Sequence, residues 1–264
     1  MLNKLTYSKC PPRIQRGLDR RRISATVLLA ENLGAGDAGD EIRRQVFERL
    51  NTGGLSLNAQ ELRNSLYSGP FNDLINELAG LRLFNKVWDI PPYVDHYRRE
   101  DNFISSELAE NKLFSRMQDC EIVLRFFAFR RHSQIKGSVR RILDQCMHEY
   151  RDADEAKLYA FRQSFVDALE LAHKLFQDKT FRLRVKEHGK WTLSQPLYDA
   201  VMVALDDLKS ETERLIAARG KIQNAMTAAY QNERNYDIII GKPNTANAIK
   251  DRIDLVRKVI RDCI

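Results

Sequence analysis

The chain has 264 residues, of which 43 are Lys or Arg and 36 are Asp or Glu, so its formal net charge is +7. Hydrophobic residues make up 43% and charged residues 30%, a composition that excludes a disordered tail and allows a substantial core. No apolar run approaches the roughly 18 residues of a membrane span, and the N-terminal residues lack the apolar centre of a secretion signal. We therefore expect a cytoplasmic protein without a membrane partner.

Cysteine, histidine, glycine and proline narrow the class of protein further. The 4 cysteines and 5 histidines show no metal-binding spacing and no Cys-x-x-Cys pair. We expect reduced thiols, as in cytoplasmic proteins, and no metal site. The low content of glycine (12) and proline (7) favours long helices over a β architecture with many turns.

The first expected elements are a helix that begins near Pro12 and a strand at 23–29. Proline is tolerated in the first turn of a helix. The stretch 23–29 is short and β-branched, and the glycine-rich segment 34–37 follows it, a pattern typical of a strand. We find no partner strand in the chain, so the edge of this strand is expected to be exposed and to promote self-association.

The next segment predicts a corner between two helices. Residues 41–50 are expected to be helical, and Asn51 or Gly53 can take the left-handed conformation that ends a helix. Asn58, with Glu61 three residues later, is close to a capping box and predicts the start of the second helix.

This corner has features of an anion site. The Gly53-Gly54 turn exposes backbone N–H groups beside a helix N-terminus, which is a natural phosphate-binding geometry. Arg49 and Arg63 flank the turn and would add charge-assisted donors. The alternative is a well-capped helical corner with surface arginines.

Helical periodicity dominates the rest of the chain. Apolar residues recur at alternating spacings of three and four over 113–127, 158–175 and 249–263. Further helices are expected from Ser194 to Leu205 and over 216–230. The predicted fold class is mainly α, a multi-helix bundle with a residual α/β edge at the N-terminus.

Two basic clusters stand out against this pattern. They contain Arg13, Arg16, Arg20, Arg21 and Arg22 near the N-terminus, and Arg182, Arg184 and Lys186 within 179–190. Clusters of this kind attract phosphate backbones and predict contacts with nucleic acid. The alternative is a solvated face that keeps the protein soluble.

Several stretches resemble a known family. The sequences Phe-Glu-Arg-Leu-Asn-Thr-Gly-Gly at 47–54 and Leu-Asn-x-Gln-Glu-Leu-Arg-Asn at 57–64 resemble the N-terminal part of GmrSD-type, modification-dependent restriction systems. The similarity continues at 116–127, 197–200 and 251–253. The resemblance implies a ParB/sulfiredoxin-like domain followed by helices.

Two motifs of that family are linked to nucleotide binding and hydrolysis. One, Phe-x-x-x-Asn followed by Gly, matches Phe47, Asn51 and Gly54. The other, Asp-Gly-Gln-Gln-Arg, does not occur in the 264 residues, and no His-Asn-His-type nuclease site is found. The resemblance therefore implies a remnant of the ParB/sulfiredoxin-like nucleotide-binding domain at 1–57 and a helical domain at 58–264.

The resemblance leads to our main hypothesis, that the chain is the C-terminal portion of a GmrSD-like restriction or defence protein. Such a protein would bind DNA, including modified DNA, and a nucleoside triphosphate with Mg. This chain would supply half of the nucleotide site, and a missing N-terminal domain or partner chain would supply the rest. Alone it is expected to hold no cofactor and to be inactive, because catalysis needs convergent ligands. The predicted nucleotide-binding residues are Phe47, Arg49, Asn51, Gly53, Gly54 and Arg63.

Two other classes of protein compete with this hypothesis. One is a helical protein-interaction module without nucleotide chemistry, in which Asn51 does no more than cap a helix. The other is an independent hydrolase that uses acids such as Glu61 and Asp119. Both acids fall on expected helices at spacings that suggest capping or surface roles, and no nucleophile motif accompanies them.

Overall fold

The computed structural model describes residues 6–22, 42, 45–46, 57–93, 105–184, 189–241 and 244–264. The chain divides into two compact units, 1–50 and 51–264. The described residues are mainly helical, as predicted. No helix in these ranges combines the length and the apolar character that a membrane crossing requires.

The described part of the first unit is a short 3-10 turn, η1 (Tyr7–Lys9), followed by the helix α1 (Pro12–Asp19). Pro12 occupies the first turn of α1, which confirms the predicted helix start. The hydroxyl of Tyr7 donates to Asp19 Oδ1 over 2.6 Å. The predicted strand at 23–29 lies outside the described residues. Within the expected helix 41–50 the described residues, Ile42, Gln45 and Val46, are helical.

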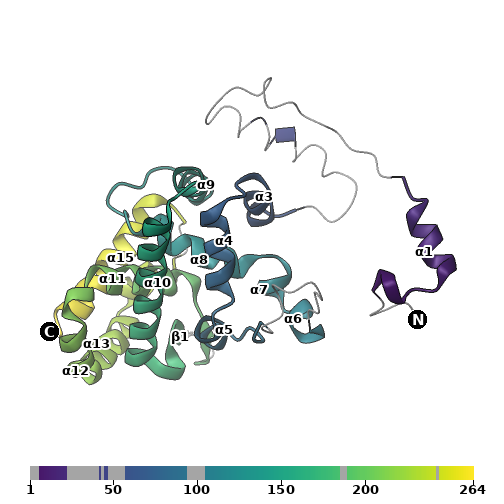
Figure 1. Cartoon of the computed structure of the whole chain (residues 1–264). Helices are drawn as coiled ribbons and strands as arrows, with labels where there is room; N and C mark the ends of the chain where they lie inside the picture. The colour runs from purple at the N-terminus through teal and green to yellow at the C-terminus, as the bar shows by residue number, and fades with distance from the viewer. Residues whose placement is uncertain are drawn as a thin grey trace. The chain divides into compact units, whose positions relative to one another are not determined.

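The described part of the second unit is built from helices and a short two-stranded sheet (Figure 1). Its first half contains α3 (Ala59–Leu66), α4 (Pro70–Ala79), α5 (Arg82–Val87), α6 (Ser106–Glu110), α7 (Lys112–Ser115), α8 (Gln118–Phe129) and α9 (Val139–Tyr150). Its second half contains α10 (Glu155–Phe176), η3 (Gln177–Lys179), β1 (Arg182–Arg184), β2 (Trp191–Leu193), α11 (Gln195–Asp207), η4 (Lys209–Glu211), α12 (Thr212–Ala217), α13 (Arg219–Gln231), α14 (Glu233–Ile240) and α15 (Ala246–Arg261).

The helix α11 lies at the centre of this unit. It packs against α8, α10 and α15 (Figure 1) and also against α14, and every residue from Leu197 to Asp206 is buried. The helix begins where the sequence predicted. The Ser194 hydroxyl accepts from the Leu197 amide over 3.3 Å and so caps the helix. A helix that is apolar all round belongs in the interior, and α11 occupies that position.

A layer of aromatic rings joins α4, α8 and α10. The ring of Phe71 meets those of Phe127 and Phe161 edge-on, at centroid distances of 5.5 and 5.7 Å. Such pairs add about 0.5–1.5 kcal/mol each beyond the burial of their area. The apolar stripe predicted over 158–175 faces this layer from α10, which confirms the assignment of that stripe to the core.

Two expectations differ from the structure. The stripe over 113–127 is not one helix, because a turn with Met117 at a positive φ of 51° separates α7 from α8. The helix expected over 216–230 is broken at Ala218, where α12 ends and α13 begins. In addition, β1 and β2 form an antiparallel pair that was not expected.

Candidate functional site

The segment that carries the family resemblance leads into the N-terminus of α3, and this terminus is held by a capping box. The side chain of Asn58 accepts from the backbone amides of Gln60 and Glu61 over 2.8 and 2.9 Å. In return Glu61 Oε2 accepts from the Asn58 amide over 2.6 Å. The predicted capping box is therefore confirmed, with asparagine in the place of serine or threonine.

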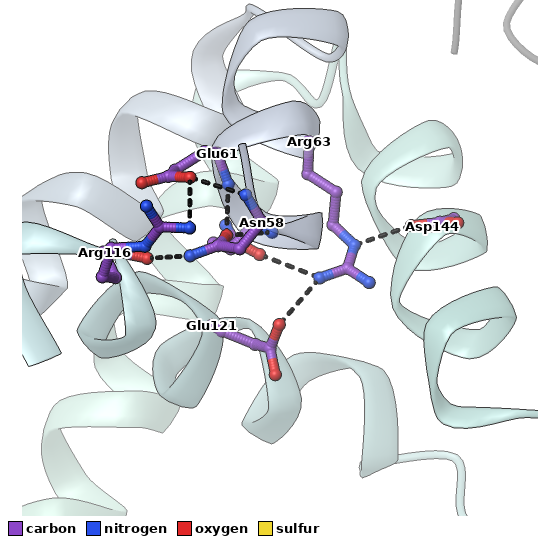
Figure 2. A network of polar contacts seen from close by, with 7 residues as sticks. Asn58, Glu61, Arg63, Arg116, Glu121 and Asp144 are labelled. Atoms are coloured by element: carbon purple, nitrogen blue, oxygen red, sulfur yellow. Dashed lines mark hydrogen bonds and ion pairs between the residues drawn. The ribbon is translucent and has the colours of Figure 1, made fainter. Parts of the chain in front are cut away.

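The cap also fastens α3 to the turn between α7 and α8 (Figure 2). Asn58 Nδ2 donates to the carbonyl of Arg116 over 2.6 Å, and the Arg116 guanidinium lies 3.4 Å from Glu61 Oε2. The left-handed Met117 breaks the helical ladder at this point, and the Arg116 carbonyl accepts from Asn58. One asparagine thus satisfies a helix end and joins two segments that are distant in the sequence.

Arg63 is the one predicted phosphate contact that the structure describes, and it is buried. Only 2% of the residue is exposed. Its Nε donates to Asp144 Oδ1 over 2.6 Å and its Nη1 donates to Glu121 Oε2 over 3.0 Å (Figure 2). The guanidinium therefore holds α3 against α8 and α9. Because its Nε and Nη1 are bonded to carboxylates, Arg63 joins helices in this structure, and its nucleotide role stays a prediction.

We call this network, made of Asn58, Glu61, Arg63, Arg116, Glu121 and Asp144, the α3 corner. The other predicted nucleotide contacts, Phe47, Arg49, Asn51, Gly53 and Gly54, lie outside the described residues. The carboxylates of the α3 corner face Arg63 or Arg116 and do not form a set of metal ligands. The described side of the corner therefore provides an anchor for the start of α3.

The predicted nucleic-acid residues fall in both units. Arg13, Arg16, Arg20, Arg21 and Arg22 are all exposed on or just after α1. In the second unit Arg182 makes a two-pronged ion pair with Asp89 at 2.6 and 2.7 Å, while Arg184 Nε donates to the Gly189 carbonyl over 3.2 Å. Lys186 lies outside the described residues.

The β1–β2 pair forms one wall of a hollow of about 230 Å³ that was not predicted. Lys179 and Arg182, from the basic stretch 179–190, line it together with Trp191, Arg219 and Tyr230. We call it the hairpin hollow. The nearest signal in the sequence is a tryptophan directly after a basic run, since an aromatic ring among cations is typical of nucleic-acid binding.

Three of the resembling stretches meet in a buried ionic cluster. Arg125 Nε, on α8, donates to Asp199 Oδ1 of α11 over 3.0 Å, and Arg252 of α15 lies close enough for Asp199 to affect its pKa. Burial lowers the pKa of Arg125, but the charge of Asp199 and the hydrogen bonds to it outweigh burial and raise it. These stretches therefore supply an interior ion pair of the helical body.

Arg252 is almost fully buried, at 1% exposed, and its position explains why residue 241 is a glycine. Its Nε donates to the Ile238 carbonyl over 3.0 Å, and burial lowers its pKa. A Cβ at Gly241, which has a positive φ of 71°, would collide with Arg252 Nη2. Glycine is thus required both by the left-handed backbone and by the guanidinium beside it.

The acids proposed for an independent hydrolase have structural partners. Glu61 belongs to the capping box, and Asp119 is 1% exposed, with the Tyr93 hydroxyl and the Cys120 amide donating to its carboxylate. Burial raises the pKa of Asp119, and the hydrogen bond from Tyr93 partly offsets that shift. Among the described residues no group of three His, Cys, Asp or Glu side chains is placed to hold a metal ion.

Comparison of the chain with protein-family models, with curated proteins and with solved structures gave no match.

Proposed function

We propose that this chain is the helical, DNA-binding portion of a nucleotide-dependent restriction or defence protein of the GmrSD type, and that it supplies half of a nucleoside-triphosphate site. The observation that carries the proposal is the α3 corner. The motif at 47–54 comes shortly before the N-terminus of α3, whose cap is tied to the α7–α8 turn by Asn58, and Arg63 ties α3 to α8 and α9.

A rigid anchor is what a nucleotide motif needs. A half-site can complete a phosphate cradle only if its backbone is held in position, because loosely placed donors lose most of their effect. The first turn of α3 contributes the positive end of a helix dipole, which favours an anion nearby. The remaining phosphate contacts and the metal would come, on this proposal, from another segment that carries Asp-Gly-Gln-Gln-Arg.

The nucleotide role is tested by binding to the chain reconstituted with the segment encoded upstream of it. The unchanged pair is expected to bind a nucleoside triphosphate, and Asn51→Ala is expected to abolish binding while the helical circular-dichroism signal is retained. Asn224→Ala, at an exposed position of α13, is the matched control and should bind normally. Equal binding by all three proteins would contradict the proposal.

The DNA role is tested by the salt dependence of affinity. A chain that engages several phosphates through its exposed arginines should show a steep negative slope of log affinity against log salt. Replacing Arg13 and Arg16 by Gln is expected to reduce that slope by about one for each phosphate contact that is lost. A flat slope, or no binding at low salt, would remove DNA from the proposal.

The alternative function is a helical protein-interaction module without nucleotide chemistry. The observation that favours it is the state of Arg63, whose Nε and Nη1 donate to Asp144 and Glu121. On this alternative Asn51→Ala changes stability alone, by about 1 kcal/mol for a lost helix cap. The nucleotide titration above therefore separates the two functions.

A further inference from the structure

The hairpin hollow lies where the end of α10, the turn η3, the β1–β2 pair and one side of α13 come together. Its lining includes Phe176, Lys179, Trp191, Arg219 and Tyr230, and its volume is about 230 Å³. These elements come from positions 176 to 230, so the site exists only in the folded chain. Asp178 is the only acid among the described lining residues.

Two cations of the hollow differ from the third in their surroundings. Arg182 is paired with Asp89, but among the described residues no carboxylate lies within ion-pair distance of Lys179 or Arg219. Arg219 is the first residue of α13, a helix that has no capping side chain and no acid in its first turn. A cation at a helix N-terminus opposes the helix dipole, and an anion bound there would relieve this.

The hollow also presents an aromatic face. Trp191 is 37% exposed, which is unusual for so large an apolar side chain. The ammonium of Lys179 lies over this ring, 4.8 Å from its centre, so it covers part of one face and a base would stack on the part of the ring that stays exposed. A ring beside cations matches a ligand whose planar, apolar base is joined to a phosphate.

A larger hollow of about 470 Å³ between α8 and α9 lacks this combination. Arg131, Lys136 and Arg141 line it, but its aromatic rings are closed to a ligand. Phe127 and Tyr150 are 4% and 7% exposed, and Arg131 is paired with Glu149 at 2.9 Å. Its cations could attract an anion, but no ring is available for a base to stack on.

We infer that the hairpin hollow binds single-stranded DNA, with one unpaired base stacked on Trp191 and the adjoining phosphates on Lys179 and Arg219. The inference rests on the proposed DNA-binding function, and it specifies the form of DNA, a single strand, that this surface of the chain would bind. Stacking requires a free base face, which duplex DNA does not present. The hollow therefore selects strands with an unpaired base, at a place distant in the sequence from the nucleotide motif.

The test is a fluorescence titration of the full chain with an oligothymidylate of about ten nucleotides, within the usual site size of such proteins. The chain has 2 tryptophans, and Trp88 is only 4% exposed, so a change on stacking reports on Trp191. The strand is expected to quench the emission, and Trp191→Phe should abolish the quench. Trp191→Ala is expected to weaken affinity by about tenfold to a hundredfold.

Tyr159→Ala is the matched control, because Tyr159 is exposed at 65% on α10 and does not line the hollow. It should bind as the unchanged chain does. Thymidine monophosphate and a duplex of the same length should leave the emission of Trp191 nearly unchanged. Equal affinity of Trp191→Ala and the unchanged chain, or equal quenching by the duplex, overturns the inference.

The same proteins separate this inference from the proposed function. Suppose that the chain binds duplex DNA with a steep salt slope and that substitutions of Trp191 do not change this binding. That result would contradict the proposed role of the hollow and would still support the DNA-binding function. Nucleotide binding is measured with the Asn51 variant and a nucleoside triphosphate, so its outcome is read separately from the strand titration. If Trp191→Ala alters the hairpin, Lys179→Gln provides a second variant. It is expected to weaken the affinity for the strand several-fold.

Discussion

The α3 corner and the hairpin hollow both gather basic side chains, but they use them in opposite ways. In the α3 corner the guanidinium of Arg63 lies between Glu121 and Asp144 and is 2% exposed. In the hairpin hollow Lys179 and Arg219 have no such carboxylate among the described residues, and a tryptophan lies open beside them. Paired charge indicates a structural joint, and unpaired charge beside an open ring indicates a ligand surface.

This difference has an energetic consequence. Removing one partner of a buried pair leaves an uncompensated charge inside the protein, so the free energy of unfolding falls. Removing an exposed cation changes folding little, but it removes a contact to an anionic ligand. Substitutions in the two regions should therefore separate into one group that alters stability and another that alters binding.

Asp199→Ala is expected to have the largest effect of all the variants, a loss of stability. Arg125 would remain buried at 3% exposed without its counter-charge, and we expect a loss of about 3–5 kcal/mol in the free energy of unfolding. Urea denaturation followed by circular dichroism measures it. Asp207→Ala breaks a more exposed pair with Arg257 and should lose less than about 1 kcal/mol. Equal losses would contradict the assignment of the interior pair.

Arg63→Ala is expected to come next, with a loss of about 2–3 kcal/mol. The loss is smaller than for Asp199 because Glu121 and Asp144 keep side-chain exposures of 29% and 20% and can be solvated again. DNA affinity, measured at a salt concentration where the variant is folded, should not change. A large loss of DNA or nucleotide affinity with normal stability would instead make Arg63 a ligand contact and break the comparison.

The joint and the hollow also differ in how far the sequence could predict them. The Asn58–Glu61 capping box depends on residues three apart, so local chemistry was enough to predict it, as it was for α10. The partners of Arg63 lie 58 and 81 residues away in the sequence. No periodicity reveals such pairs, and the sequence therefore predicted a free phosphate contact where the structure has a joint.

The hairpin hollow was missed for a related reason. Its strands have three residues each, too few to show an alternating pattern, and its cation Arg219 comes from a different helix. The break at Met117 was equally hidden, because the left-handed turn is linked to Asn58 by a bond across 58 positions of the sequence. Helices were predictable from local pattern, whereas the contacts between them were not.

A smaller effect is expected for Asn58→Ala, because it removes a helix cap rather than a counter-charge. We expect a loss of about 1 kcal/mol from the cap, increased somewhat by the loss of the bond to the Arg116 carbonyl. Asn58→Ser keeps an oxygen for the amides of α3 and loses the bond to Arg116, so it should lose less. Thermal unfolding of the two variants measures the difference. If Asn58→Ser lost more than Asn58→Ala, the cap would not be the main contribution of Asn58.

Arg219→Gln is expected to have the smallest effect on folding and so to complete the comparison. The side chain has no carboxylate partner among the described residues and lies at an unfavourable end of the α13 dipole, so the free energy of unfolding should change by less than about 0.5 kcal/mol. Binding should respond differently, because losing one phosphate contact lowers the salt slope for single-stranded DNA by about 0.7. Urea denaturation and a salt titration on the same preparation measure both quantities. An unchanged slope with an unchanged stability would mean that Arg219 touches no phosphate, and a marked destabilisation would mean that the hollow, like the α3 corner, is a structural joint.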